Sequence, residues 1–185
     1  MGAGVRAEAS AAIISHVLDC AEVLALSPGD VVAAYESFGT EPSTIDLVAL
    51  LQARGLTVIV PAVLDDRQLD WVSASDGSSL GVPAIGEAVF VIAPALACDR
   101  RGTRLGRGGG SYDRTLSHVA SSTPVCALVY EDEVVGELPR EPHDRGVTMA
   151  AIPSGIVRFQ APARPWPTSA VRCAGSSTRR SRRSM

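Results

Sequence analysis

Apolar positions recur along this chain with two different periods, which indicates a mixture of helices and strands. Residues 5–26 and 44–54 carry apolar side chains at helical spacing, and the second segment follows a capping candidate, Ser43 or Thr44, and precedes Gly55. Short β-prone runs and one more helix complete the predicted elements: strands at 31–35, 56–60, 69–73, 88–93, 125–130 and 147–152, and a helix at 112–120.

The order of these elements predicts the fold class. A strand–helix–strand unit is predicted at residues 31–35, 44–54 and 56–60, and Pro61 is expected to end its second strand. A second such unit follows later in the chain. The repetition predicts an α/β protein with three layers, α/β/α, around a mostly parallel central sheet with right-handed crossovers. The segment at 69–73 alternates in polarity, which predicts an antiparallel or edge strand.

Composition divides the chain into a folded body and a tail. Residues 1–160 are long enough for one domain with a single core, whereas residues 161–185 are rich in Pro, Arg and Ser and are expected to be disordered. The net charge of −3 at pH 7 hides an asymmetry, because the tail holds six arginines and no acidic residue. Such a tail could touch nucleic acid non-specifically, but it lacks interleaved aromatic residues, and we predict no specific nucleic-acid partner.

The remaining composition argues against several kinds of site. The four cysteines are scattered without a C-x-x-C pair or a His/Cys cluster, which disfavours a zinc site and a disulfide framework. The chain contains no lysine, so it cannot carry a Walker A motif. No leader-like segment and no apolar run of membrane-spanning length is present, and we expect a cytoplasmic, monomeric protein without membrane contact.

One segment combines the features that a phosphate-binding site needs. It consists of Arg104, Leu105, Gly106, Arg107, Gly108, Gly109, Gly110, Ser111, Tyr112, Asp113 and Arg114. Consecutive glycines let the backbone approach a ligand and present N–H donors, arginines can form charge-assisted hydrogen bonds to phosphate, and a carboxylate can bind magnesium. The spacing does not fit a dinucleotide fingerprint, because Ser111 occupies the place of the third glycine. A solvated glycine-rich turn is the alternative.

Three motifs, in this order, go beyond that general pattern. They are Glu41-Pro42-Ser43-Thr44; the strand and signature formed by Phe90-Val91-Ile92-Ala93-Pro94, Asp99-Arg100-Arg101-Gly102, Arg104-Leu105-Gly106 and Gly108-x-Gly110-x-Tyr112-Asp113-Arg114; and His143-Asp144. On these residues the chain resembles the 5-formyltetrahydrofolate cyclo-ligases, also called 5,10-methenyltetrahydrofolate synthetases. The resemblance extends over about residues 4–157 and implies the same three-layer α/β/α architecture.

The resemblance also implies an activity and a set of ligands. The reaction is the ATP-dependent cyclisation of 5-formyltetrahydrofolate to 5,10-methenyltetrahydrofolate, with ADP and phosphate released and a phosphorylated formyl intermediate. Residues 104–112 would bind ATP, with Arg104 and Arg107 in the catalytic role. The metal Mg²⁺ would be held by Asp113 and Asp144. The reduced folate would bind Glu41 and, as a weaker candidate, Glu36, and Trp71 would either stack on the pterin or lie in the core.

The chain also departs from the family pattern. Members usually begin with a Lys- and Arg-rich helix that contacts the ATP phosphates, whereas here Arg6 is the only basic residue before Arg54, so that helix is expected to be missing. Ser111 and Cys98 replace aromatic residues. Two alternatives therefore stay open: a weakened paralogue that binds folate or nucleotide as a sensor, and a phosphosugar-isomerase-like protein of the same broad architecture that ignores ATP.

Overall fold

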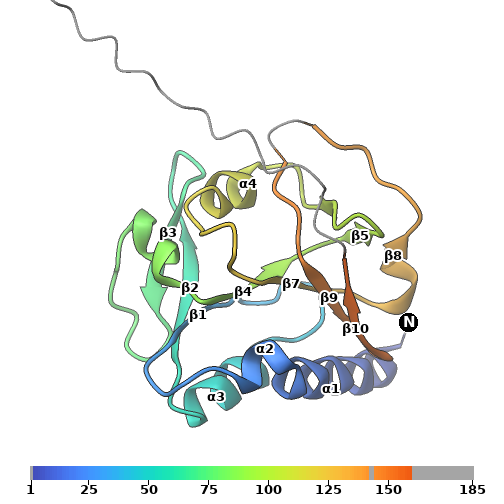
Figure 1. Cartoon of the computed structure of the whole chain (residues 1–185), viewed down its shortest axis with the longest axis horizontal. Helices are drawn as coiled ribbons and strands as arrows, with labels where there is room; N and C mark the ends of the chain where they lie inside the picture. The colour runs from blue at the N-terminus through green and yellow to red at the C-terminus, as the bar shows by residue number, and fades with distance from the viewer. Residues whose placement is uncertain (1, 142–143, 160–185) are drawn as a thin grey trace, which may run out of the picture.

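Seven strands form a central sheet in which the parallel arrangement dominates. The computed structural model describes residues 2–141 and 144–159 (Figure 1). In sheet order the strands are β10 (Gly155–Arg158), β9 (Met149–Ile152), β7 (Val125–Leu128), β4 (Phe90–Pro94), β1 (Val31–Ala33), β2 (Thr57–Val63) and β3 (Leu69–Ser73). The five inner strands run parallel, and the two edge strands, β10 and β3, pair antiparallel with their neighbours.

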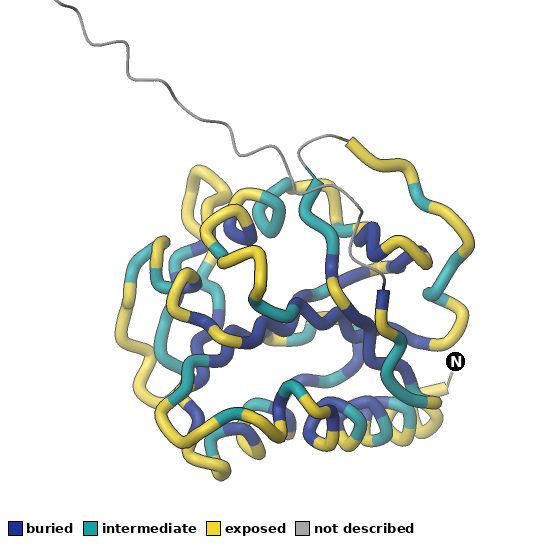
Figure 2. Tube along the Cα trace, in the orientation of Figure 1, coloured by how far each residue is buried: buried dark blue, intermediate teal, exposed yellow. Residues whose placement is uncertain are grey.

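Helices cover both faces of this sheet, which confirms the predicted α/β/α layers. One face carries α1 (Ala3–Asp19), α2 (Ala21–Leu24) and α3 (Ile45–Ala53), and the other carries α4 (Ser111–Leu116) and the 3₁₀ helix η1 (Val82–Glu87) (Figure 1). The strands between them are the most deeply buried part of the trace (Figure 2). Each face therefore has its own apolar core, because the inner strands are buried on both sides.

A second, smaller sheet lies beyond the carboxyl end of β4. It consists of β6 (Arg104–Leu105), β5 (Ala97–Asp99) and β8 (Val134–Val135), and a short 3₁₀ helix, η2 (Glu131–Glu133), precedes β8. The chain reaches β5 directly from β4 and returns as a hairpin through β6. The sequence patterns did not predict β10 or this sheet, whose strands have only two or three residues each.

The structure corrects four local predictions. The helix predicted at 5–26 breaks at Cys20, whose backbone is extended (φ −71°, ψ 148°). Strand β2 does not end at Pro61 but continues to Val63, because β1 pairs only with residues 57–59 and Pro61 lies beyond the end of β1, where its missing N–H is tolerated. The helix predicted at 112–120 ends at Leu116, since bonds of the 3₁₀ type replace the α-helical ladder there.

The fourth correction concerns the start of α3. Thr44 precedes the helix, yet neither it nor Ser43 forms a side-chain cap. The Thr44 hydroxyl instead donates to the Tyr35 carbonyl at 2.6 Å, and the Ser43 N–H donates to Ser10 in α1. Thr44 therefore closes the loop between β1 and α3 on itself, and Ser43 fastens that loop to α1.

Two further predictions concern Trp71 and the C-terminal tail. Trp71 is fully buried and its indole N–H donates to Thr115 in α4, so it lies in the core as one of the two alternatives held. The tail predicted at 161–185 lies outside the described residues, and so does Cys173. Within the described part of the chain, no helix is both long and apolar enough to cross a membrane.

Candidate functional site

The sheet topology places the predicted site residues at one edge. From β1 the chain crosses through α3 to β2, on one side of β1, whereas from β4 it crosses through α4 to β7, on the other side. The loops that leave the carboxyl ends of β1 and β4 therefore diverge, and ligands of open α/β sheets bind in the crevice at such a switch point. Glu41 lies in the first loop and residues 104–110 lie in the second.

Asp99 holds the base of the glycine-rich segment together. Its carboxylate is fully buried and accepts hydrogen bonds from the backbone N–H groups of Arg101 (2.8 Å), Thr103 (2.9 Å) and Leu138 (3.2 Å). Burial disfavours the charge, but these N–H donors, Thr103 first, outweigh it and hold the pKa of Asp99 below its ordinary value. The β5–β6 hairpin is thereby fixed against the segment that follows β8.

Arg104, which was predicted to grip phosphate, is a buried residue with protein partners. Its side chain is only 3% exposed and its guanidinium donates to Asp113 at 3.1 Å and to the Pro94 carbonyl at 3.3 Å. The guanidinium carbon also lies 5.5 Å from the centre of the Tyr112 ring. Arg104 therefore ties the hairpin, the end of β4 and the start of α4 to one another, and its Nε has no partner among the described residues.

The backbone that follows Asp144 bonds to the carboxylate of Asp113, the other residue predicted to bind magnesium. Asp113 Oδ1 accepts both the Arg104 bond and the backbone N–H of Arg145, the residue directly after Asp144 (3.1 Å). The Asp144 carboxylate accepts from the Glu141 N–H at 2.7 Å. Among the described residues there is no group of three His, Cys, Asp or Glu side chains suited to a metal ion. His143, the other residue of that motif, lies outside the described residues.

Glu41 and Arg107, which the motifs assign to different ligands, form an ion pair. The guanidinium donates to Glu41 Oε1 through Nη2 (2.9 Å) and Nε (3.2 Å), and the other carboxylate oxygen accepts from the Phe38 N–H at 2.9 Å. The Glu41 side chain is 9% exposed and that of Arg107 is 57% exposed. Arg107 also lies over the Phe38 ring, 5.6 Å from its centre. The loop after β1 and the glycine-rich segment thus meet directly.

The remaining predicted residues lie in the same two segments as this pair. Leu105 ends β6, Gly108 and Gly110 have left-handed backbones (φ +83° and +64°), and Gly110 precedes α4, which begins with Ser111 and Tyr112. Gly106 and Gly109 lie in the same turn. Glu36 is exposed, in the same loop as Glu41, and takes no part in the Glu41–Arg107 contact.

The family model for 5-formyltetrahydrofolate cyclo-ligases matches residues 1–153. The chain belongs to this family. The "5-formyltetrahydrofolate cyclo-ligase" of Mycolicibacterium smegmatis is 40% identical over 152 residues, which are 71% of this chain and 78% of that protein. The mitochondrial protein of the same name from Arabidopsis thaliana is 31% identical over 121 residues, 58% of this chain and 40% of that one.

Solved structures agree on the cyclo-ligase fold. The 5,10-methenyltetrahydrofolate synthetase of Aquifex aeolicus superposes with a TM-score of 0.69 at 21% identity, covering 93% of this chain and 91% of that one. The synthetase of Mycoplasma pneumoniae gives a TM-score of 0.68 at 18% identity, covering 82% and 88%. At these identities the comparison supports the architecture, and the site rests on the residues of this chain.

Sequence reasoning missed Tyr35, Tyr130 and Glu133, which the cyclo-ligase fold brings to the same edge. Tyr35 follows β1, Tyr130 follows β7, and Glu133 accepts from the Tyr130 N–H at 2.8 Å. Burial, and to a smaller extent the negative charges of Asp132 and Glu41, raise the pKa of Glu133. The sequence signal for the two tyrosines was their position at the ends of β-prone runs, where side chains of parallel strands converge.

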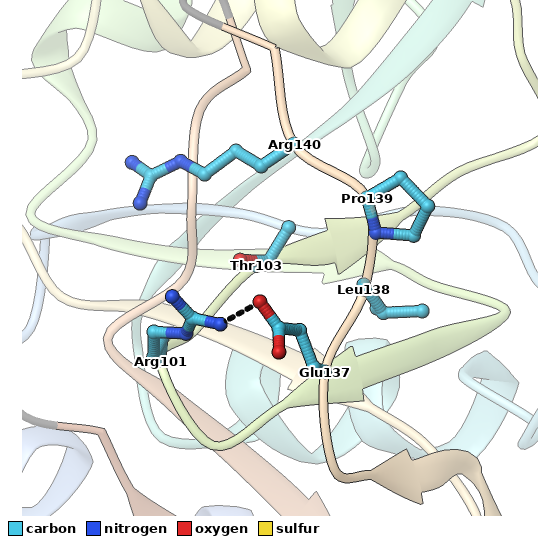
Figure 3. Close-up of a pocket in the computed structure, with 6 residues that line it drawn as sticks. All are labelled: Arg101, Thr103, Glu137, Leu138, Pro139 and Arg140. Atoms are coloured by element: carbon cyan, nitrogen blue, oxygen red, sulfur yellow. Dashed lines mark hydrogen bonds and ion pairs between the residues drawn. The ribbon is translucent and has the colours of Figure 1, made fainter.

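A pocket of about 230 Å³ lies beside the turn between β5 and β6, which we call the signature turn, rather than at the Glu41–Arg107 pair. It is lined by Arg101, Thr103, Glu137, Leu138, Pro139 and Arg140, and the Arg101 and Glu137 side chains form an ion pair across it (Figure 3). Sites for drug-sized ligands usually have volumes of about 300–1,000 Å³. This pocket is therefore too small for a nucleotide or a folate and belongs to the framework that Asp99 holds.

Proposed function

We propose that this chain catalyses the ATP-dependent closure of 5-formyltetrahydrofolate to 5,10-methenyltetrahydrofolate, with release of ADP and phosphate. One observation carries the proposal beyond family membership. The contact between Arg107 and Glu41 joins residues 66 positions apart, one from the glycine-rich segment and one from the loop after β1. A phosphate-binding segment and a folate-binding carboxylate in contact are what a transfer between ATP and folate requires.

The chemistry explains why no protein nucleophile is required. The formyl oxygen on N5 is a poor leaving group, so it first attacks the γ-phosphorus of ATP and ADP departs. N10 of the folate then attacks the activated formyl carbon and gives up its proton to solvent, and phosphate leaves with the former formyl oxygen. Such transfers depend on positioning and on stabilising charge. The protein must therefore hold two substrates in line and exclude competing water.

The two arginines would contribute differently to ATP binding. Arg107 is exposed and would exchange Glu41 for phosphate oxygens, together with backbone N–H groups of residues 106–112. Arg104 is buried and already bonded to Asp113 and Pro94, so it would act mainly by placing positive charge beneath the phosphates. Glu41, once released from Arg107, would accept hydrogen bonds from the N–H groups of the reduced pterin.

Magnesium fits the acidic residues of this edge. Mg²⁺ commonly binds through one or two carboxylates together with substrate phosphates rather than through a full protein cage. Asp113 and Asp144 would supply those carboxylates, since the N–H that follows Asp144 bonds to Asp113. When bound, the ion would neutralise charge on the transferring phosphate. Asp113 meanwhile keeps Arg104 oriented, so the two charges of this edge are positioned together.

The direct test uses purified protein with ATP, magnesium and 5-formyltetrahydrofolate, and follows the absorbance of the methenyl product. Product that requires ATP supports the proposal, whereas folate binding without product favours the sensor alternative. The variant Arg107→Ala removes a charge-assisted contact of about 1.5–3 kcal/mol, so ATP binding should weaken about tenfold or more. The matched control is Arg158→Ala, because Arg158 also forms a half-exposed ion pair, with Glu22, away from this edge.

The prediction of a monomer in the cytoplasm that handles only small molecules belongs to the same proposal. Size-exclusion chromatography of the active protein tests the monomer. Association that depends on concentration would contradict it.

A further inference from the structure

All three tyrosines of the chain bring their hydroxyl groups into the same region. Tyr35 follows β1, Tyr112 lies at the start of α4 and Tyr130 follows β7, so they come from three neighbouring crossover connections of the sheet. Each hydroxyl oxygen is buried and has no hydrogen-bond partner among the described residues. The fourth buried side-chain atom in that condition is Nε of Arg104, which lies against the Tyr112 ring.

The three tyrosines pack around one apolar cluster: Tyr35 and Tyr130 are buried members of it, and Tyr112 packs against it. Burial raises the pKa of Tyr35, and the nearby Glu41, Tyr112 and Tyr130 raise it further. Burial also raises the pKa of Tyr112, against the lowering effect of Arg104. Tyr35 and Tyr112 therefore stay neutral at neutral pH. A phenol hydroxyl can both donate and accept a hydrogen bond.

No described residue bonds to the hydroxyl of Tyr35 or Tyr130. The two bonds that hold the turn after β7 involve the backbone of Tyr130, whose N–H donates to the Glu133 carboxylate and whose carbonyl accepts from the Glu133 N–H. The carbonyl of Tyr35 accepts from Thr44, again leaving its hydroxyl aside. A phenylalanine would fill the same apolar surroundings without burying a polar atom, and a buried hydroxyl that stays unpaired costs free energy.

We propose that the hydroxyls of Tyr35 and Tyr130 bind the polar edge of the reduced pterin next to Glu41 and so position the 5-formyl group. A pterin edge presents carbonyl and ring-nitrogen acceptors beside N–H donors. Carboxylate oxygens can satisfy only the donors, whereas phenols satisfy either kind. The inference rests on the proposed function and adds residues to its folate site, while Tyr112 stays with the ATP segment.

The test is the isosteric pair Tyr35→Phe and Tyr130→Phe, each removing one oxygen atom. We expect KM for 5-formyltetrahydrofolate to rise about three- to tenfold for each variant, from the loss of one hydrogen bond to the ligand. KM for ATP should not change. The melting temperature should stay equal or rise, because a hydroxyl without a protein partner is removed.

Thr115→Val is the control for a buried hydroxyl that does have a protein partner. It removes the acceptor of the Trp71 indole N–H, on the opposite face of the sheet, so it should lower the melting temperature and leave both KM values unchanged. Calorimetric titration with 5-formyltetrahydrofolate in the absence of ATP provides a readout independent of turnover. There the two Phe variants should bind three- to tenfold more weakly than wild type.

Each outcome decides between named alternatives. Wild-type protein that neither binds the folate nor forms product would overturn the proposed function and this inference with it. Active wild-type protein with unchanged folate KM in both Phe variants would overturn only the inference. A rise in KM for ATP instead would assign the hydroxyls to the nucleotide, and a fall in melting temperature with unchanged KM would make them structural. Either result contradicts the pterin assignment.

Discussion

Replacing Gly102 with alanine tests the close packing that holds the signature turn. Gly102 has a left-handed backbone (φ +78°), and a Cβ atom there would lie 2.3 Å from the Val147 carbonyl oxygen. The two backbones cannot separate easily, because the Val147 N–H donates to the Gly102 carbonyl at 2.8 Å. The left-handed conformation costs alanine about 1–2 kcal/mol and the forced backbone shift about 1–3 kcal/mol more, about 2–5 kcal/mol together.

Gly77→Ala separates these two contributions. Gly77 has a similar φ of +73° in the turn after β3, but a Cβ atom there would meet nothing within 4 Å. The control should therefore lose only about 1–2 kcal/mol. At about 2–4 °C per kcal/mol for a domain of this size, Gly102→Ala should melt about 2–12 °C below the control in a calorimetric or circular-dichroism scan. Equal melting temperatures for the two variants would refute the close approach to Val147.

Three further predictions follow from the charges and thiols. Asp113→Asn should lower the melting temperature as well as activity, because buried Arg104 loses its counter-charge. An unchanged melting temperature would contradict the pairing of Arg104 with Asp113. Partial recovery of activity at high magnesium would support the metal role of Asp113. The hydrogen bond from Arg158 lowers the pKa of Glu22 below its ordinary value of 4.5. The ion pair therefore stabilises the fold above pH 4.5, and this stabilisation is lost as the pH falls. The difference in melting temperature between wild type and Arg158→Gln should accordingly disappear in acid. Burial raises the pKa of the Cys98 thiol to about 12, so iodoacetamide at pH 8 should label it only after denaturation, as peptide mass spectrometry would show.

Most of the sheet could be predicted from local sequence because its strands are continuously apolar and bounded by turn residues. The run predicted at 88–93 corresponds to β4, with boundaries shifted by one or two residues. Trp71 lies in the core because its side chain on the edge strand β3 points inward against α4. The errors lie where one local preference competes with another. Ser117 is such a place: its hydroxyl donates to the Arg114 carbonyl at 2.6 Å and helps to end α4 before its predicted boundary.

The candidate site was predictable as a set of residues but not as a set of pairs. The motifs contain Arg107 and Glu41, and the topology alone brings their loops to one edge, yet each motif was interpreted through a separate ligand. Without a ligand the two opposite charges lie close enough to satisfy each other, and the structure pairs them. Residue types in a motif report which chemistry is available, whereas the partner of each charge depends on the approach of distant loops.

Tyr35 and Tyr130 show the complementary limit, since a lone tyrosine at the end of an apolar run has no local pattern that distinguishes it from packing. Their significance comes from one comparison that only the fold allows, between a buried hydroxyl and the absence of a protein partner for it among the described residues. The Glu41 carboxylate does not bond to these hydroxyls, because Arg107 and Phe38 already occupy it. The hydroxyls thus lie without a bond at the carboxyl edge of the sheet, where proteins of this architecture bind their ligands. A packing role would require only the rings, so the hydroxyl oxygen is the atom whose removal discriminates between the two explanations.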